Sequence, residues 1–207
     1  MKLHQLAWEK DYAKRGSLWR GSSGFDPKLP KKTKILELGV GNGKNLTALV
    51  HAGYSVYAID SSQTAVKMCR ELLKKFKKKA VLKTEDCCSL SFENNFFDAV
   101  VAFHTIGHLT AAERIQSVKE IFRVLKPGGI VFFKDFGLRD MRYGKGTLVE
   151  KDSFKRGNGI WYHYFTEKEL RELFKEFKTK ELGIESWKVF FAGKDYYRQE
   201  VHGVFEK

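Results

Sequence analysis

The sequence predicts an α/β protein in which helices cover both faces of a mostly parallel sheet. From residue 34 onward, short apolar segments alternate with longer stretches of helical periodicity, which is the pattern of a parallel sheet. Three glycines at alternate positions, Gly39, Gly41 and Gly43, separate the first apolar segment from the helical stretch after it. A strand that turns into a helix through such bare backbone lets a nucleotide-like ligand approach closely.

The expected elements follow one another along the chain. Strands are expected at residues 34–38, 55–60, 80–84, 97–103 and 130–136, with two more near 178–189 and 200–205. Helices are expected at residues 44–52, 62–76, 110–125 and 166–177. Thr110 with Glu113, and Thr166 with Glu169, have the spacing of a helix-capping box. The third helix is expected to bury a stripe formed by Ile115, Val118, Ile121, Phe122 and Leu125.

Length and composition predict one domain, residues 1–207. Residues 1–30 are expected to form an N-terminal helix or lid, and residues 137–165 a substrate-side insertion without clear periodicity. No apolar run approaches the ~20 residues of a membrane span, and the chain does not open with a signal peptide, so a cytoplasmic location is expected. Cys69, Cys87 and Cys88 lack metal-site spacing, so we expect small buried side chains and no metal.

The charge balance favours a polyanionic partner. The chain has 38 Lys and Arg against 25 Asp and Glu, a net charge of +13, which is typical of nucleic-acid binding. A generally lysine-rich composition is the alternative. Residues 74–79 contain five lysines at the end of an expected helix. They form either a solvated helix end, where cations are favourable, or an RNA contact.

A carboxylate at the end of the second strand completes a nucleoside-binding pattern. Asp60 follows the glycine turn by about one strand, where it can accept hydrogen bonds from both ribose hydroxyls. The glycine spacing differs from the G-x-G-x-x-G of dinucleotide sites. Glu37 precedes the first glycine by two residues, and Asp86 follows the third strand.

Together with the turn at residues 125–129, these residues resemble class I S-adenosylmethionine-dependent methyltransferases, from about residue 34 to the C-terminus. The resemblance implies a Rossmann-like, seven-stranded, mostly parallel sheet whose last strand is antiparallel. It implies S-adenosyl-L-methionine as the cofactor, with the glycines beneath its methionine part and Glu37 near its ammonium group. The other implied cofactor residues are Asp60 and Ser61 at the ribose, Asp86 and the Cys87 backbone at the adenine, and Phe103 with His104 near the methyl group.

The segment after the fifth strand resembles the transfer-RNA 3-methylcytidine methyltransferases. Residues 133–140 read FKDFGLRD against the family's F-R-D-Y-G-L-x-D, and Tyr164-Phe165-Thr166 corresponds to Y-F-F-T. Residues 8–15 are similar to the W-x-x-[FY]-Y-x-[KR] segment of that family. Lys134 replaces the family's arginine, Asn158 replaces an aspartate, and most of the long N-terminal extension is missing.

The chemistry that this resemblance implies needs no general base. Cytosine N3 offers a lone pair without a proton, and a nearby carboxylate would stabilise the cationic product. Asp135 is the candidate carboxylate, or else a turn-closing residue. With Asp135, the candidate catalytic residues are Lys134 and His104, although His104 and His108 could instead be structural. An Asn/Asp-Pro-Pro-Tyr/Phe cluster, typical of exocyclic-amine methylation, is absent after the fourth strand.

Basic and aromatic residues alternate around the expected mouth of the site. The candidate substrate-binding residues are Arg139, Arg142, Tyr143, Arg156 and Tyr164. Lys145, Lys155, Trp161 and Tyr162 accompany them. The cations suit phosphates and the rings suit stacking on unpaired bases, although the rings could equally pack as a lid.

Three functional hypotheses remain open at this stage. The first is methylation of a base in a single-stranded loop of transfer RNA. The second is a small-molecule methyltransferase in which residues 137–165 close over an apolar pocket. The third is a binding module that methylates only with an accessory protein. The sequence makes no prediction of the oligomeric state.

Overall fold

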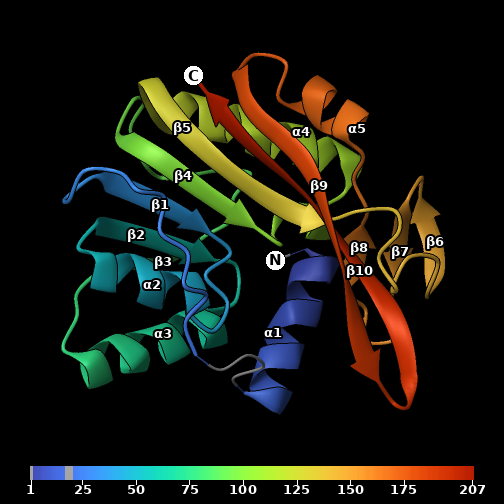
Figure 1. Ribbon diagram of the computed structural model, residues 1–207. Helices are drawn as coiled ribbons and strands as arrows, with labels where there is room; N and C mark the ends of the chain where they lie inside the picture. Colours follow the sequence, from blue (N-terminus) through green and yellow to red (C-terminus); the bar gives the residue numbers. More distant parts are fainter. Residues whose placement is uncertain (1, 17–20) are drawn as a thin grey trace.

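A computed structural model describes residues 2–16 and 21–207. Its main sheet has seven strands in the order β3-β2-β1-β4-β5-β10-β9 (Figure 1). These strands are β1 Lys34–Leu38, β2 Ser55–Asp60, β3 Val81–Thr84, β4 Phe97–Phe103, β5 Leu125–Phe136, β9 Lys178–Phe191 and β10 Lys194–Glu206. The first five are parallel, and β10 runs antiparallel to β5 and β9. The predicted Rossmann-like sheet with an antiparallel last strand is confirmed.

Helices bury apolar residues on both faces of this sheet. The helices are α1 Leu3–Arg15, α2 Lys44–Ala52, α3 Gln63–Phe76, α4 Ala111–Val124 and α5 Glu167–Leu173. One apolar cluster joins α2 and α3 to one face of the sheet, and a second joins α4 and α5 to the other. Because β1 and β4 are buried on both faces, their sequences are continuous apolar runs.

The predicted helix starts are confirmed at the level of single hydrogen bonds. Ser62 accepts from the Ala65 N–H, and Thr110 forms a reciprocal capping box with Glu113. One predicted core residue is wrong, because the Ile115 side chain is exposed. Ile115 is 53% exposed, whereas Val118 and Ile121 of the same stripe are buried.

Three features differ from the expected elements. The turn at residues 126–129 is part of β5, although Gly128 has a left-handed φ of 76°. Strand β10 begins at Lys194, six residues before the expected start at 200. Segment 137–165, expected to lack periodic structure, contains a three-stranded sheet made of β6 Thr147–Glu150, β7 Ser153–Lys155 and β8 Trp161–His163. These strands are too short to show a periodicity, and they depend on packing of Phe154 and Tyr164 against Phe136.

Within the part of the chain that the structure describes, no helix is both long and apolar enough to cross a bilayer.

Candidate active site

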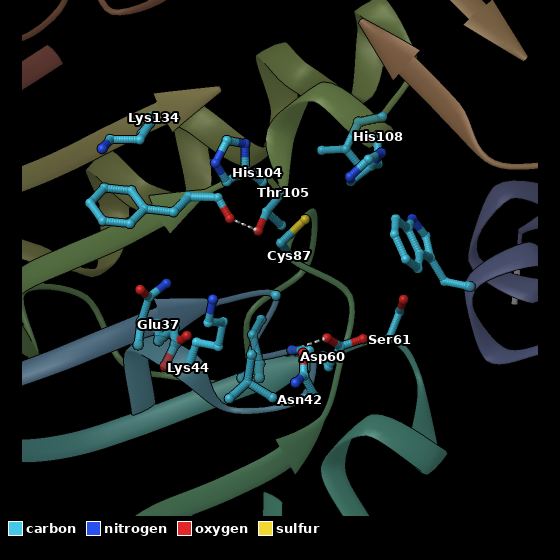
Figure 2. A pocket seen from close by; sticks show the side chains of 18 of the residues that line it. Glu37, Asn42, Lys44, Asp60, Ser61, Cys87, His104, Thr105, His108 and Lys134 are labelled. Atoms are coloured by element: carbon cyan, nitrogen blue, oxygen red, sulfur yellow. Dashed lines mark hydrogen bonds between the residues drawn. The ribbon is translucent and has the colours of Figure 1, made fainter. Parts of the chain in front are cut away.

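A cavity of about 640 Å³ lies at the carboxyl ends of the parallel strands. This is where open α/β sheets bind ligands. Figure 2 shows Glu37, Asn42, Lys44 and Asp60 on one wall and His104, Thr105 and Lys134 on the opposite wall. The short helix η1, Ile106–His108, follows β4 at the second wall.

The glycine turn at residues 39–43 forms part of the first wall. Gly39 has a φ of 69°, and a Cβ at this position would collide with the Thr105 side chain. Gly41 has a φ of 52°, and a Cβ here would lie 2.8 Å from the Tyr12 hydroxyl. Both positions therefore require glycine, as predicted from the spacing. Gly43 does not line the cavity; it precedes α2 in the left-handed conformation.

Two buried carboxylates flank the turn. Glu37 is 2% exposed and its Oε2 has no hydrogen-bond partner among the described residues. Burial raises the pKa of Glu37 well above its usual range. Asp60 accepts hydrogen bonds from the N–H groups of Gly41 and Ser62, both at 2.9 Å. Burial raises the pKa of Asp60 to about 6 against these hydrogen bonds.

The end of β3 supplies the predicted adenine-side residues. Both Asp86 and Cys87 line the cavity. The Asp86 carboxylate accepts from the Cys88 N–H at 2.9 Å and pairs with Lys2 at 3.0 Å. Burial alone would raise the pKa of Asp86. The hydrogen bonds from the Cys88 N–H and Lys2 outweigh burial, so the pKa is lowered overall. All three cysteines are buried and free, as expected.

Helix α1 covers this part of the cavity. His4, Gln5, Trp8 and Tyr12 line it, and sequence reasoning did not select any of them individually. The Glu9 carboxylate anchors the helix, because it accepts from the Ser62 hydroxyl at 2.6 Å and the Thr64 hydroxyl at 2.5 Å. In the sequence, the i, i+4 spacing of Trp8 and Tyr12 could have indicated that these two residues act together. Their rings are 5.5 Å apart in the structure.

His104 dominates the opposite wall. Its φ of 50° is unusual for a residue other than glycine. Its Nε2 lies 3.1 Å from Glu200 Oε1, and its Nδ1 lies 3.7 Å from Asp135 Oδ1. Burial lowers the pKa of His104, but the two carboxylates outweigh burial and raise it to about 9. The imidazolium ring stacks on Phe136 at 4.6 Å, and Lys134 lies 3.5 Å from Glu200.

The structure corrects the expected placement of Asp135. This side chain is 1% exposed and does not line the cavity. Its oxygens accept from the N–H groups of Gly107 at 2.8 Å and Phe136 at 2.9 Å. Strand β5 points Asp135 away from the cavity because neighbouring residues alternate between faces. Glu200 of β10, which sequence reasoning missed, is the carboxylate in the wall. In the sequence, Glu200 could be noticed only as an acidic residue within a strand whose apolar residues alternate.

The five predicted substrate-binding residues separate into different environments. Arg142 lines the cavity. Arg139 and Tyr143 are exposed outside it, and Arg156 is half-buried outside it. Tyr164 is fully buried and packs against Phe136, so it cannot stack on a base. Tyr162 and Arg198 line the cavity as well. Sequence order alone could not separate these residues because they lie in irregular and short-strand segments.

Two further histidines have protein partners; one of them, His108, was expected to be structural or substrate-binding. The Nδ1 of His108 lies 2.6 Å from the carbonyl oxygen of Trp161. Burial lowers the pKa of His108, so it is held neutral at the cavity edge. His163 lies between Ser153 at 2.8 Å and Glu169 at 2.7 Å, away from the cavity.

Comparisons with known proteins agree with this geometry. Residues 36–133 match a family described as a methyltransferase domain. The chain is 27% identical over 163 residues to a tRNA N(3)-methylcytidine methyltransferase of Schizosaccharomyces pombe, covering 73% of this chain and 53% of that protein. It is 28% identical over 152 residues to a tRNA N(3)-cytidine methyltransferase of Danio rerio, covering 68% and 43%. The chain thus spans about half the length of the curated relatives it matches.

Solved structures share the fold. An S-adenosylmethionine-dependent methyltransferase of Methanosarcina mazei superposes with a TM-score of 0.75 at 27% identity, covering 88% of this chain and 98% of that chain. TehB of Haemophilus influenzae superposes with a TM-score of 0.69 at 17% identity, covering 97% and 67%, which supports the fold alone.

The cavity residues fit S-adenosylmethionine. The unpartnered Glu37 oxygen can accept from an ammonium group, the glycine turn leaves room for a chain to cross it, and Asp60 ends β2 beside it. The chain therefore matches a methyltransferase domain over residues 36–133 and resembles class I S-adenosylmethionine-dependent methyltransferases, among them the tRNA N(3)-cytidine methyltransferases.

Proposed function

We propose that this protein methylates a base of transfer RNA, at N3 of cytosine. The choice of cytosine N3 as the nucleophile rests on one observation. His104 is held as an imidazolium between two carboxylates, with its pKa raised to about 9. The neighbouring acids are weak bases, because His104 outweighs burial and lowers the pKa of both Asp135 and Glu200. His104 and Glu200 thus supply no strong base beside the target, which suits a nucleophile that has a lone pair and no proton to lose.

The residues of the first wall would hold the cofactor. Glu37 would bind the ammonium group, Asp60 and Ser61 the ribose hydroxyls, and Asp86 with the Cys87 backbone the adenine. Bound there, S-adenosylmethionine supplies a methyl group on a positively charged sulfur. Trp8 and Tyr12 of α1 would exclude water, and Phe103 would pack beside the transferred methyl group.

The second wall would hold the base. Methylation at N3 leaves a positive charge on the cytosine ring, and Glu200 presents a carboxylate to the cavity to stabilise it. Asp135 acts as a positioning residue, because its carboxylate lies 3.7 Å from His104 Nδ1 and accepts from the Gly107 N–H behind the wall. Lys134 is held beside Glu200, where it can orient the carboxylate or bind a phosphate.

The transfer-RNA substrate rests on two observations. The curated relatives are named for cytidine N(3) in transfer RNA, and the net charge of +13 suits a polyanion. Since the chain spans about half the length of these relatives, we include an accessory protein as a further part of the proposal. We also propose a cytoplasmic location, where such a substrate is found.

The test is methylation of unmodified bulk transfer RNA by the purified chain. Nucleoside mass spectrometry is expected to show 3-methylcytidine, with a rate that falls steeply between about 50 and 200 mM salt. Asp60→Ala is the matched control, and calorimetry is expected to show that it no longer binds the cofactor. A rate indifferent to salt, or transfer to small molecules but not to RNA, would contradict the proposal. Activity that appears only after adding a cell extract would show that an accessory protein is required.

A further inference from the structure

The β9–β10 hairpin extends beyond the main sheet as a two-stranded ribbon. Strand β10 pairs with β5 only over residues 200–206, whereas residues 194–199 pair only with residues 186–191 of β9. Figure 1 shows the red hairpin continuing past the ends of the other strands. We call residues 186–199 the ribbon. A free two-stranded ribbon is marginally stable in water, so its persistence requires support.

That support comes from the segment directly after β5. Gly137 donates its N–H to the Gln199 carbonyl at 3.0 Å, and Met141 donates to the Tyr197 carbonyl at 2.8 Å. Arg198 Nε donates to Asp140 Oδ2 at 2.6 Å. The ribbon is therefore held in a fixed direction relative to the cavity.

The strand register divides the ribbon side chains between two faces. Arg198 pairs with Trp187, and Tyr196 pairs with Val189, so these residues share one face. This inner face is continuous with the cavity, because Arg198 and Glu200 line the cavity. Tyr197 pairs with Lys188 on the outer face.

Rings and cations alternate from the cavity onto the inner face. The His104 ring lies 4.6 Å from the Phe136 ring. Arg198 Cζ lies 5.3 Å from the Phe136 ring and 5.7 Å from the Trp187 ring. Arg142 Cζ lies 4.5 Å from Phe136. Arg198 thus lies between the Phe136 ring at the cavity and the half-buried Trp187 ring on the inner face.

We propose that the inner face of the ribbon binds the unpaired nucleotides that flank the target base. This inference rests on the proposed function and adds where the RNA strand lies. Trp187 and Tyr196 would stack on bases, and Arg142, Arg198 and Lys145 would meet phosphates, as single-stranded RNA sites require. Lys145 already lies 5.9 Å from the Tyr196 ring. Bases within a duplex do not present their faces, so the target lies in a single-stranded loop.

Fluorescence anisotropy with labelled bulk transfer RNA tests this placement, with S-adenosylhomocysteine present. Trp187→Ala is expected to raise the dissociation constant about tenfold, the size of one lost base stack. Trp187→Phe is expected to restore most of the affinity, because the smaller ring still stacks. Tyr197→Ala is the matched control; its ring is 56% exposed on the outer face, and its affinity is expected to stay within about twofold.

Melting temperature and S-adenosylhomocysteine binding check the folding of each variant. If Trp187→Ala does not fold, Tyr196→Ala makes the same comparison with its immediate neighbour Tyr197. Wild-type affinity in both inner-face variants, together with methylation of transfer RNA by the wild-type protein, would overturn this inference alone. A wild-type protein that neither binds nor methylates transfer RNA, with or without cell extract, would overturn the proposed function and this inference with it.

Discussion

Two carboxylates beside the glycine turn are buried where charge is costly. Burial raises the pKa of both Glu37 and Asp60, and one Glu37 oxygen has no hydrogen-bond partner among the described residues. Buried acids with raised pKa values cluster at ligand sites. The cofactor would supply the missing hydrogen bonds, so its binding should depend on the ionisation of these groups.

At the residue scale, cofactor affinity is expected to rise with pH. Because the pKa of Asp60 is raised to about 6, the carboxylate is protonated at lower pH and cannot accept from both ribose hydroxyls. Calorimetry should show the association constant falling roughly tenfold for each pH unit below about 6. In Asp60→Asn the affinity should be weak and its dependence on pH near 6 should disappear. An unchanged pH profile in that variant would contradict the role of Asp60.

A second residue-scale prediction concerns His104. Its raised pKa of about 9 means that the folded state binds the proton more tightly than the unfolded chain, whose histidine pKa is about 6.5. The resulting stabilisation is complete below about pH 6.5 and is lost as the pH rises through about 9. Because 35% of the side chain is exposed, solvent screening reduces the effect to about 1–2 kcal/mol.

Urea unfolding at pH 6 and pH 9.5 measures this effect. The wild-type protein should lose free energy of unfolding between the two pH values, and His104→Gln should lose less. Equal losses in the two proteins would show that the Asp135 and Glu200 contacts do not hold the proton.

At the element scale, α1 covers the cavity, and the Glu9 carboxylate is one of its anchors. Glu9 accepts from the Ser62 and Thr64 hydroxyls at the start of α3. This contact places Trp8 and Tyr12 over the cavity. The sequence resemblance at residues 8–15 pointed to this segment, but its contact with α3 depends on residues about 55 positions away in the chain.

Glu9→Ala is expected to loosen α1 without unfolding the sheet. Loss of three hydrogen bonds to this half-exposed charged group costs roughly 2–4 kcal/mol of local stability. Hydrogen exchange of the α1 amides should become faster, and cofactor affinity should fall because water enters the cavity. Lys10→Ala, an exposed neighbour on the same helix, is the control. Equal exchange rates in the two variants would show that Glu9 does not anchor the helix.

At the scale of the whole molecule, the lysine run is separated from the cavity by the length of α3. The helix has 14 residues, so at ~1.5 Å per residue its ends are about 21 Å apart. Ser62 begins α3 beside Asp60, whereas Lys77 ends it in the left-handed conformation. The lysines of residues 74–79 are all exposed. The structure thus favours the solvated helix end over a contact with the target base.

Replacing Lys74, Lys78 and Lys79 together by Ser is expected to leave transfer-RNA affinity within about twofold. Each phosphate contact contributes about one unit to the slope of affinity against salt, so the slope should also be unchanged. Anisotropy titrations across a salt series measure both quantities. A slope reduced by two units or more would instead identify the run as an RNA contact.

Sequence alone was sufficient for the main sheet and the first wall of the cavity. Glycine conformations, helix caps and apolar strands are local properties, so Gly39, Gly41, Asp60 and the Thr110 cap could be predicted from their neighbours. The second wall could not be predicted in this way. Whether Asp135 faces the cavity depends on the pleat of β5, and Glu200 reaches His104 only because β10 pairs beside β5.

Only the tertiary structure decided which charged and aromatic residues meet. The small sheet of residues 147–163 is stabilised by packing rather than by periodicity, so Tyr164 is buried while Arg142 reaches the cavity. The ribbon face that carries Trp187 and Arg198 follows from a register set by distant strand pairing. Local physics thus determined the glycine turn and the carboxylates of the first wall, whereas contacts between residues far apart in the chain determined the opposite wall.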